Sequence, residues 1–501
     1  MNPLPYPTIR WSQETPGAAA VIDRSGVISY AELETRIVAG ALLLQELGVH
    51  AGDRVIICAA NSVEWIIAAH AITRIGAVLV PITVRLNSAN AASHRESLKP
   101  ALILIDVERF SFWFQNRGGR RLVFTLEEFA EHARRFTGSN ETIKNTIEPE
   151  TLHSIVFTSG TAGVPKGVCL SFRNHLANAF ASAVNLGVLP EDRWLLNLPL
   201  YHVGGLAIIL RAALYGTAVV LADSTDGAAT AQFISEYRIT QLSLVATTLW
   251  RLVRSGVRHF PDHLRSILVG GGPVPIRILD EAVGSHLPVL PTYGMTETAS
   301  QAATAAPCDV QLRRSVARPL CLTEISIRGD GGRELPAGSE GRICVRGPMV
   351  GMGYWQGSDR IAPLIDQDGW FATSDVGSLD DGGRLSVAGR IDHVIISGGE
   401  KIHPEELEAM LIQSPKVSNA AVIPEDDPVW GQRPVAYVEL EPGGLLVVAD
   451  VSDWLASSFP RYKLPVRVVI VPQLPLLPSG KIDRQALSSS AFLTQTRPQS
   501  P

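Results

Sequence analysis

A segment rich in glycine, serine and threonine, residues 157–168, is the first stretch whose residue types point to chemistry. It reads Phe-Thr-Ser-Gly-Thr-Ala-Gly-Val-Pro-Lys-Gly-Val and follows an apolar run. Glycines let backbone N–H groups turn toward an anion, and hydroxyl groups and a lysine charge add to the same cradle. The residues available for this are Thr158, Ser159, Gly160, Thr161, Gly163 and Lys166. No Gly-Lys-Ser/Thr follows, so this is not a Walker loop, and a polar surface turn is the alternative.

A carboxylate follows a second apolar run, in the segment Tyr293-Gly294-Met295-Thr296-Glu297-Thr298. Beside a phosphate-binding loop, Glu297 would hold magnesium, which takes one or two carboxylates together with phosphate oxygens. Tyr293 would be free to stack on a purine ring. Taken singly, Glu297 is equally a solvated turn carboxylate and Tyr293 a partly buried core residue.

Three more polar residues stand in short glycine-containing segments of the C-terminal half. Asp375 ends Gly-Trp-Phe-Ala-Thr-Ser-Asp and could accept hydrogen bonds from ribose hydroxyls, Arg390 lies in Gly-Arg-Ile-Asp, and Lys481 ends Pro-Ser-Gly-Lys. Each is, on its own, a common kind of exposed turn residue. Together with the first two segments, however, they follow one another in a fixed order along the chain.

The elements that must position these residues alternate between helix and strand. Apolar residues at helical spacing predict a helix over 30–47, which ends at Gly48. Short apolar, β-branched runs predict strands over 54–59, 77–82, 152–158, 218–222, 241–245 and 266–269. This alternation predicts an α/β fold, a mainly parallel sheet covered by helices.

The pattern changes in the last third of the chain. After Ile325, short strands alternate with glycine turns expected at 328–332, 340–347 and 380–383. From about residue 391 a final segment has its own helix, 404–412, and strands over 420–423, 434–440 and 466–471. The sequence thus predicts a large N-terminal domain of helix-covered sheets with a β-rich subdomain, and a small α+β C-terminal domain whose tail is disordered from about residue 488.

Composition narrows the functional classes. A chain of 501 residues is long enough for two or more domains. A net charge of -5 argues against a nucleic-acid partner, and five scattered cysteines without CxxC spacing indicate neither disulfides nor a zinc site. There is no signal-peptide pattern and no membrane-spanning run. We expect a cytoplasmic protein that acts on small molecules, as a monomer or a homo-oligomer.

Taken together, the motifs resemble the adenylate-forming superfamily of acyl-CoA synthetases, peptide-synthetase adenylation domains and luciferases. The loop, Tyr-Gly-Met-Thr-Glu, Gly-Trp-Phe-x-Thr-x-Asp, Gly-Arg-Ile-Asp and Pro-Ser-Gly-Lys follow one another across more than 300 residues. The resemblance covers nearly the whole chain. It implies an enzyme that uses ATP and Mg²⁺ to convert a carboxylic acid into an acyl-adenylate and then passes the acyl group to coenzyme A.

The resemblance also implies a role for each motif residue. Lys481 would bridge the attacking carboxylate and the α-phosphate, and Glu297 would bind magnesium. Asp392 would be the hinge of a mobile C-terminal domain, 392–501, that turns against domain 1–391 between half-reactions. Gly398 and Gly399 would then face the CoA channel. Implied ATP contacts are Thr158, Ser159, Gly160, Thr161, Gly163, Lys166, Gly271, Gly272, Pro273, Tyr293, Gly294, Thr296, Asp375 and Arg390. Ala162 departs from the family pattern, in which a second threonine is common there.

Three stretches, 198–206, 269–275 and 293–301, most resemble the o-succinylbenzoate–CoA ligases of menaquinone and phylloquinone synthesis. His202 would lie between the ATP and acyl pockets and take part in catalysis; a buried histidine bonded to a carbonyl is the alternative. Arg211 stands in an otherwise apolar stretch, and the second carboxylate of that acid would give it a bidentate partner. Alternatively, Arg211 reaches the surface. Thr298 and Ser300 are further candidates for the acyl pocket.

Three other functions remain open on the sequence. One is a CoA ligase for another aryl or fatty acid, which would differ only in the acyl pocket. A second is an adenylation enzyme that loads a carrier protein, although no amino-group-binding aspartate or fused carrier domain is evident. A third is a nucleotide-binding protein without activity, which should have lost Glu297, Asp375, Arg390 or Lys481, and all four are present.

Overall fold

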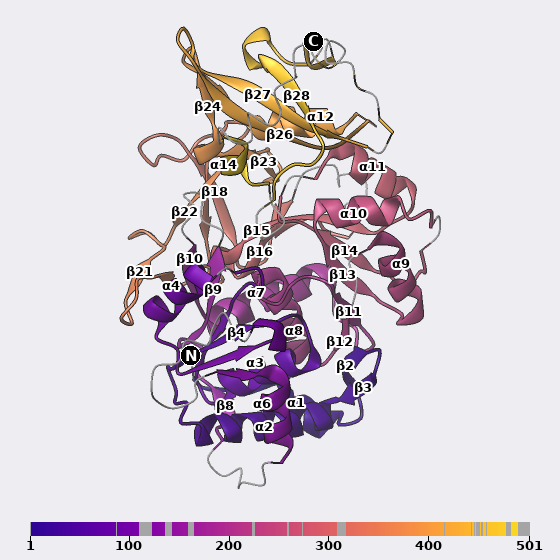
Figure 1. Ribbon diagram of the computed structural model, residues 1–501, viewed down its shortest axis with the longest axis vertical. Helices are drawn as coiled ribbons and strands as arrows, with labels where there is room; N and C mark the ends of the chain where they lie inside the picture. Colours follow the sequence, from indigo (N-terminus) through magenta and orange to yellow (C-terminus); the bar gives the residue numbers. More distant parts are fainter. Residues whose placement is uncertain are drawn as a thin grey trace.

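The structure, a computed structural model, has a large part and a smaller C-terminal part, drawn in gold and yellow at one end of the molecule (Figure 1). It describes residues 2–86, 88–109, 123–135, 143–158, 165–222, 226–257, 260–272, 274–307, 317–414, 416–441, 443–444, 446, 451, 454–456, 458–476 and 482–488.

An eight-stranded sheet forms one layer of the large part, in the order β21-β20-β10-β9-β5-β4-β6-β7. Its strands from β9 to β7 are parallel, whereas β10, β20 and β21 are antiparallel. The bounds are β4 Arg54–Cys58, β5 Val78–Pro81, β6 Leu102–Ile105, β7 Val123–Thr125, β9 Leu152–Thr158, β10 Lys166–Ser171, β20 Gly353–Trp355 and β21 Ile361–Pro363.

A nine-stranded sheet forms a second layer, in the order β17-β16-β15-β14-β13-β11-β12-β2-β3. Its centre is parallel and its edges are antiparallel, so the mainly parallel strands expected from the sequence are divided between two mixed sheets. The bounds are β2 Ala19–Asp23, β3 Gly26–Ser29, β11 Arg193–Leu196, β12 Ala218–Leu221, β13 Gln241–Leu244, β14 Ser266–Val269, β15 Val289–Met295, β16 Ser300–Thr304 and β17 Arg318–Pro319.

Helices fill the space between the two sheets and cover their outer faces. Their apolar residues join those of both sheets in one core, to which β5 contributes Leu79, β11 Leu196 and α8 Ile209. The bounds are α1 Pro7–Glu14, α2 Tyr30–Glu46, α3 Val63–Arg74, α4 Ser88–Leu98, α6 Leu126–Arg134, α7 Phe172–Leu186, α8 Val203–Tyr215, α9 Gly227–Glu236, α10 Ala246–Val253 and α11 Ile276–Gly284. Over the described residues, each helix is too short or too polar to cross a membrane.

Two neighbouring helices, α7 and α8, matter most for the site. Helix α7 begins at a capping box in which Ser171 Oγ accepts from the Asn174 N–H and Asn174 Oδ1 accepts from the Ser171 N–H. Helix α8 begins after His202 and ends at Gly216, whose φ of 77° lies in the left-handed region. Both helices pack against β16, so side chains from both can meet beside that strand.

A four-stranded antiparallel sheet, β18-β19-β22-β23, forms the β-rich subdomain. Its bounds are β18 Glu324–Arg328, β19 Gly341–Arg346, β22 Phe371–Leu379 and β23 Leu385–Arg390. The turns expected at 328–332 and 380–383 are present, but 340–347 is not a turn. Most of it is strand β19, because Ile343, Cys344 and Val345 are buried between β18 and β22.

The C-terminal part contains a five-stranded sheet and the helix α12, Pro404–Ile412. The strand bounds are β24 Ile395–Ser397, β25 Glu400–Ile402, β26 Val417–Asp427, β27 Gly431–Leu440 and β28 Arg467–Val471. Helix α12 packs on β26 and also contacts β23 of the β-rich subdomain. The predicted fold class, an α/β large part with a β-rich subdomain and a small α+β C-terminal part, is confirmed. The boundary at 391/392 stays a prediction.

Candidate active site

The hairpin β9–β10 brackets the glycine-rich loop. Thr158, the last residue of β9, is the register partner of Lys166, the first residue of β10, so the two ends of the loop lie side by side. Lys166 is exposed, and its Nζ lies 5.3 Å from the centre of the Tyr354 ring. The loop residues predicted to bind phosphate, Ser159, Gly160, Thr161 and Gly163, lie outside the described residues.

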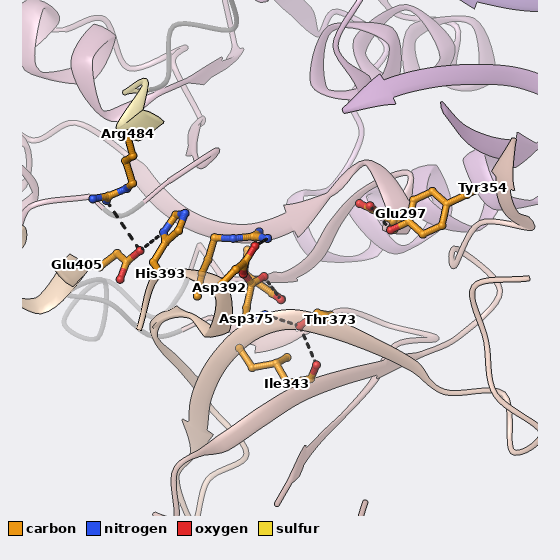
Figure 2. A network of polar contacts seen from close by, with 11 residues as sticks. Glu297, Ile343, Tyr354, Thr373, Asp375, Asp392, His393, Glu405 and Arg484 are labelled. Carbon is orange, nitrogen blue, oxygen red and sulfur yellow. Dashed lines mark hydrogen bonds and ion pairs between the residues drawn. The ribbon is translucent and has the colours of Figure 1, made fainter. Parts of the chain in front are cut away.

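Glu297 lies against this hairpin. It belongs to the short 3₁₀ helix η3, Thr296–Thr298, which packs on β9 and β10. The Tyr354 hydroxyl donates to Glu297 Oε1 at 2.8 Å, as Figure 2 shows. Burial, and then the charge of Glu297, raise the pKa of Tyr354, so this hydroxyl stays a donor at neutral pH. Tyr354 therefore links Glu297 to Lys166.

Tyr354 belongs to none of the motifs recognised in the sequence. The available signal was Gly353-Tyr354-Trp355, a short aromatic strand between glycine-containing turns. The strand β20 pairs with β10 beyond the hairpin, which brings the ring to Lys166. Nothing local in the sequence indicates that this strand adds to the same sheet as the loop.

The carboxylate of Glu297 suits a magnesium ion that is shared with phosphate oxygens. Within the described part of the chain it forms no ion pair with a lysine or arginine, and it accepts a hydrogen bond from the neutral Tyr354 hydroxyl. No group of three or more His, Cys, Asp or Glu residues there could enclose a metal. A hard cation held by one carboxylate plus substrate oxygens fits this arrangement.

Tyr293, Asp375 and Arg390 form a second polar cluster. The Tyr293 hydroxyl donates to Asp375 Oδ2 at 2.8 Å, and Arg390 Nη1 lies 3.5 Å from Asp375 Oδ1. Arg390 Nη2 also donates to Asp392 Oδ2 at 2.9 Å. Burial, followed by the charge of Asp375, holds the pKa of Tyr293 well above its usual value. Three residues predicted separately from the sequence are therefore in direct contact, together with Asp392.

The backbone under Asp375 is fixed by a buried threonine. The Thr373 hydroxyl donates to the Ile343 carbonyl at 2.8 Å and accepts from the Asp375 N–H at 3.0 Å (Figure 2). This ties β22 to β19 at the point where the carboxylate projects. Thr373 thus fixes the backbone at Asp375. The Asp375 side chain is only 15% exposed.

The segment 294–301 makes a tight turn between β15 and β16. A side chain at Gly294 would overlap the Ser300 carbonyl oxygen, so only glycine fits. The Thr298 hydroxyl is fully engaged inside the turn: it accepts from the Met295 N–H and lies 3.1 Å from the Met295 and Ser300 carbonyl oxygens. Ser300 has a φ of 130° and is half-buried. Thr296 opens the 3₁₀ helix.

Gly271 and Gly272 lie at the carboxyl end of β14. Strand β14 runs parallel to β15, whose carboxyl end carries Tyr293, so the two segments meet at one edge of the sheet. Both glycines are exposed, and Gly271 has a φ of 84°. Pro273 lies outside the described residues. Backbone at this edge is accessible to a flat ring.

Arg211 is enclosed in the large part. Its side chain is 2% exposed, so it does not reach the surface. Its Nη2 donates to Asn178 Oδ1 at 2.7 Å, and its Cζ lies 5.3 Å from the centre of the Trp194 ring. Burial lowers the pKa of Arg211, and no carboxylate of the described residues offsets this effect. Its Nε has no hydrogen-bond partner there.

His202 directly precedes α8, the helix that carries Arg211. Its ring centre lies 4.6 Å from that of Tyr201, and the residue is half-buried. It is therefore not a fully buried core histidine. Arg211 lies nine positions further along the chain, which corresponds to about 14 Å along the helix axis.

The start of the C-terminal part holds the residue expected to be the hinge, Asp392, and the two expected to face the CoA channel, Gly398 and Gly399. Asp392 is exposed within the 3₁₀ helix η5, Ile391–His393. Gly398 and Gly399 have φ values of 59° and 91°, and a side chain at Gly398 would collide with the Trp430 ring. Lys481 lies outside the described residues, but its flanks are placed: Leu476 and Ile482 form a β-bridge, and Arg484 Nη2 donates to Glu408 Oε2 at 2.8 Å.

A His–Glu contact joins the C-terminal part to the β-rich subdomain, and another lies within the C-terminal part. His403 Nε2 lies 3.0 Å from Glu340 Oε1, which joins the start of α12 to the residue before β19. His393 Nδ1 lies 2.6 Å from Glu405 Oε1, and Glu405 also faces Arg484 at 3.9 Å (Figure 2). His393, next to Asp392, is thus linked to helix α12.

Comparison with known proteins agrees with this geometry. The family model for AMP-binding enzymes matches residues 9–355, and that for the AMP-binding enzyme C-terminal domain matches residues 406–481. A 2-succinylbenzoate–CoA ligase of Geobacillus kaustophilus is 36% identical over 476 residues, which cover 94% of this chain and 95% of the relative.

Solved structures of o-succinylbenzoate CoA synthetase from Bacillus subtilis, 30% identical to this chain, have the same fold. The complex with the acyl-adenylate intermediate OSB-AMP gives a TM-score of 0.89 and covers 98% of this chain and 99% of the other. The complex with ATP and magnesium ion gives 0.88, with 97% and 100% covered. A double mutant bound with the product analogue OSB-NCoA gives 0.73, with 98% and 99% covered.

The two family matches, the relative that spans nearly the whole chain and the clustering of the motif residues lead to one conclusion: the chain belongs to the family of AMP-binding enzymes.

Proposed function

We propose that this chain is an AMP-forming o-succinylbenzoate–CoA ligase, which serves menaquinone or phylloquinone synthesis. The choice of this acid is based on Arg211. Arg211 is a buried cation without a carboxylate partner in the described part of the chain. A buried charge is costly unless it is paired. An acid with a second carboxylate, one that is not activated, supplies the missing anion.

The chemistry begins with a poor electrophile. A carboxylate resists attack because the incoming electrons enter a group that is already an anion. Attack of its oxygen on the α-phosphorus of ATP forms a mixed anhydride and expels pyrophosphate. The thiol of coenzyme A then attacks the acyl carbon, AMP leaves, and the thiol proton is released. The products are the thioester, AMP and pyrophosphate.

The nucleotide is proposed to lie between the β9–β10 hairpin and the Tyr293–Asp375 pair. Thr158, Lys166 and the loop between them would bind the phosphates, and Thr296 the α-phosphate. Asp375 and Arg390 would bind the ribose, with Tyr293 and Gly294 against the base. Gly271, Gly272 and Pro273 would line its other side. Magnesium, held by Glu297, would neutralise phosphate charge during the attack.

The acyl group is proposed to extend from the phosphates toward Arg211. His202 stands at the start of α8 and Arg211 further along it, so one helix would border both ends of the acid. Ser300 remains a proposed contact. For Thr298 we propose a narrower role in shaping the turn, because its hydroxyl is already engaged with the backbone.

The two half-reactions are proposed to use two orientations of a C-terminal domain, residues 392–501, turning at Asp392. In the first, Lys481 would bridge the acid and the α-phosphate; in the second, Gly398 and Gly399 would face the CoA channel. The TM-scores favour this proposal, because at equal coverage the chain is more similar to the acyl-adenylate complex of its relative than to the OSB-NCoA complex. The present arrangement would therefore serve adenylation.

The direct test is pyrophosphate release over a panel of acids with ATP, Mg²⁺ and CoA. The panel holds o-succinylbenzoate, 4-oxo-4-phenylbutanoate (which lacks the ring carboxylate), benzoate and medium-chain fatty acids. We expect o-succinylbenzoate to have the highest kcat/KM by about 10-fold or more, since a charge-assisted pair contributes about 1.5–3 kcal/mol. A higher value for a monoacid would refute the assignment of the acid, and thioester formation on a carrier protein instead of CoA would refute the acceptor.

A further inference from the structure

Asn178 lies between Arg211 and the turn that follows the Tyr293–Glu297 segment. It projects from α7 and is 1% exposed. Its Oδ1 accepts from Arg211 Nη2 at 2.7 Å. Its Nδ2 donates to the Thr298 carbonyl at 3.1 Å and to the Gln301 carbonyl at 2.8 Å. One amide thus contacts helix α8 and two carbonyls of the turn, those of Thr298 and Gln301.

The partners leave the Asn178 amide only one orientation. A guanidinium can only donate, so the amide oxygen must face Arg211; carbonyl oxygens can only accept, so the amide nitrogen must face the turn. Both protons of Nδ2 are used, and no rotation about the last side-chain bond would satisfy the same groups. An asparagine is the right length and polarity for this position.

The turn that Asn178 holds carries the nucleotide segment. Ala299 and Ser300 have φ values of 52° and 130°, which are rare for residues other than glycine and need external support. In the register of β15 and β16, Gly294 pairs with Gln301 and Met295 with Ser300. The carbonyls at 298 and 301 therefore lie next to the segment that carries Thr296 and Glu297.

We propose that Asn178 is a positioning residue for both substrates: it aims Arg211 at the free carboxylate of the acid and holds the turn that places Thr296 and Glu297. The inference rests on the proposed function, since it needs Arg211 to bind the acid. It adds that the acid site and the nucleotide segment share one hydrogen-bonded side chain. Arg211 acts on the acid alone, whereas Asn178 acts on both.

Two substitutions separate the two halves of this role. Asn178→Ala removes the acceptor for Arg211 and both donors to the turn. Asn178→Asp keeps the shape, gives Arg211 a permanent carboxylate partner and removes the donors. The matched control is Asn174→Ala, one turn earlier on α7: Asn174 is equally buried and donates to two carbonyls, those of Pro348 and Val350, at 2.9 and 2.8 Å, but has no contact with Arg211.

The experiment measures pyrophosphate release with o-succinylbenzoate and with 4-oxo-4-phenylbutanoate at saturating ATP, and the KM for ATP separately. We expect Asn178→Ala to lower kcat/KM for the diacid about 10-fold, and for the monoacid about twofold or less. Asn178→Asp should cost the diacid about 100-fold, because its carboxylate competes with that of the substrate. Both variants should raise the KM for ATP about threefold, whereas Asn174→Ala should change none of these values more than twofold.

A double-mutant cycle with Arg211→Ala distinguishes the possible failures. On the Arg211→Ala background, Asn178→Ala should lower kcat/KM for the diacid less than about twofold further. If the two losses multiply, Asn178 does not act through Arg211 and this inference is wrong while the proposed function stands. If Arg211→Ala alone leaves kcat/KM for the diacid unchanged, the proposed choice of o-succinylbenzoate as the acid is wrong. Equal losses for both acids in Asn178→Ala and Asn178→Asp, matched by Asn174→Ala, would reduce Asn178 to a structural residue.

Discussion

Tyr293 and Asp375 are joined by a hydrogen bond of 2.8 Å across 82 residues of sequence, with the tyrosine hydroxyl donating to the carboxylate. The pair connects the end of β15 to β22 of the β-rich subdomain. Because the pKa of Tyr293 is held well above its usual value, the hydroxyl remains a donor through the physiological range. Asp375 is thereby held in one orientation before any ribose binds.

Tyr293→Phe should therefore weaken ATP binding and leave the ring in place. One lost hydrogen bond corresponds to about 0.5–1.5 kcal/mol, so the KM for ATP should rise about 2- to 10-fold with little change in kcat. Initial rates of pyrophosphate release against ATP concentration give both values. Tyr462→Phe, on an exposed tyrosine, is the control. An unchanged KM for ATP would mean that Asp375 needs no help from Tyr293.

Much of the fold follows from local sequence patterns. Strands β9 and β14 and helix α12 have the predicted limits, since each is an apolar run or helical repeat closed by glycine, proline or a polar turn. The glycines of residues 340–347 predict a turn, but burial of Ile343 to Val345 makes a strand there.

The site was predictable only where it has motifs. Tyr354 and Asn178 are part of none, and they act through contacts 57, 33 and 120–123 residues away in sequence. Such contacts depend on which strand joins which sheet and on how α7 packs beside α8. No local periodicity carries that information.

Substitutions of Tyr354 should separate the effect on Mg²⁺ binding from the effect on ATP binding. Tyr354→Phe removes the hydrogen bond to Glu297 but keeps the ring beneath Lys166, so the Mg²⁺ concentration for half-maximal activity should rise about 10-fold. Tyr354→Leu should in addition raise the KM for ATP, because the ring is lost. Titrations of Mg²⁺ at fixed ATP and of ATP at saturating Mg²⁺ measure the two effects. Identical behaviour of both variants would contradict the separate roles.

Substitution of Lys481 should slow adenylation but not thioester formation. Lys481→Ala should lower pyrophosphate release from acid and ATP by about 100-fold or more, as for a group aimed at developing charge. Thioester formation from a presupplied acyl-adenylate should stay within about twofold. Arg467→Ala, which breaks an exposed ion pair with Glu425 in the same part of the chain, is the control. Equal loss in both assays would contradict the proposed change of orientation.

Two buried histidines should lower the stability of the folded protein at acid pH. His153 and His175 lie with ring centres 4.9 Å apart; burial, and then the charge of Arg211, lower the pKa of His175 to about 3. The unfolded chain takes up its proton near pH 6.5, so stability falls as the pH drops from about 6.5 toward 3. At pH 5 this histidine should cost about 2 kcal/mol relative to pH 8.

Urea unfolding at pH 8 and pH 5 measures this cost. His175→Gln should reduce the difference in unfolding free energy between the two pH values by about 2 kcal/mol. His50→Gln, on an exposed histidine, is the control variant. An equal pH dependence of His175→Gln and the parent protein would show that His175 does not remain neutral in the folded state.

The proposed function requires one site to make an acyl-adenylate and then a thioester, and a single-turnover experiment checks this claim. Enzyme in excess is mixed with o-succinylbenzoate, ATP and Mg²⁺, quenched, and analysed by mass spectrometry before and after CoA is added. We expect o-succinylbenzoyl-AMP and one equivalent of pyrophosphate first, and then conversion of that adenylate into o-succinylbenzoyl-CoA and AMP. Formation of ADP and phosphate, or an adenylate that CoA does not consume, would contradict the claim.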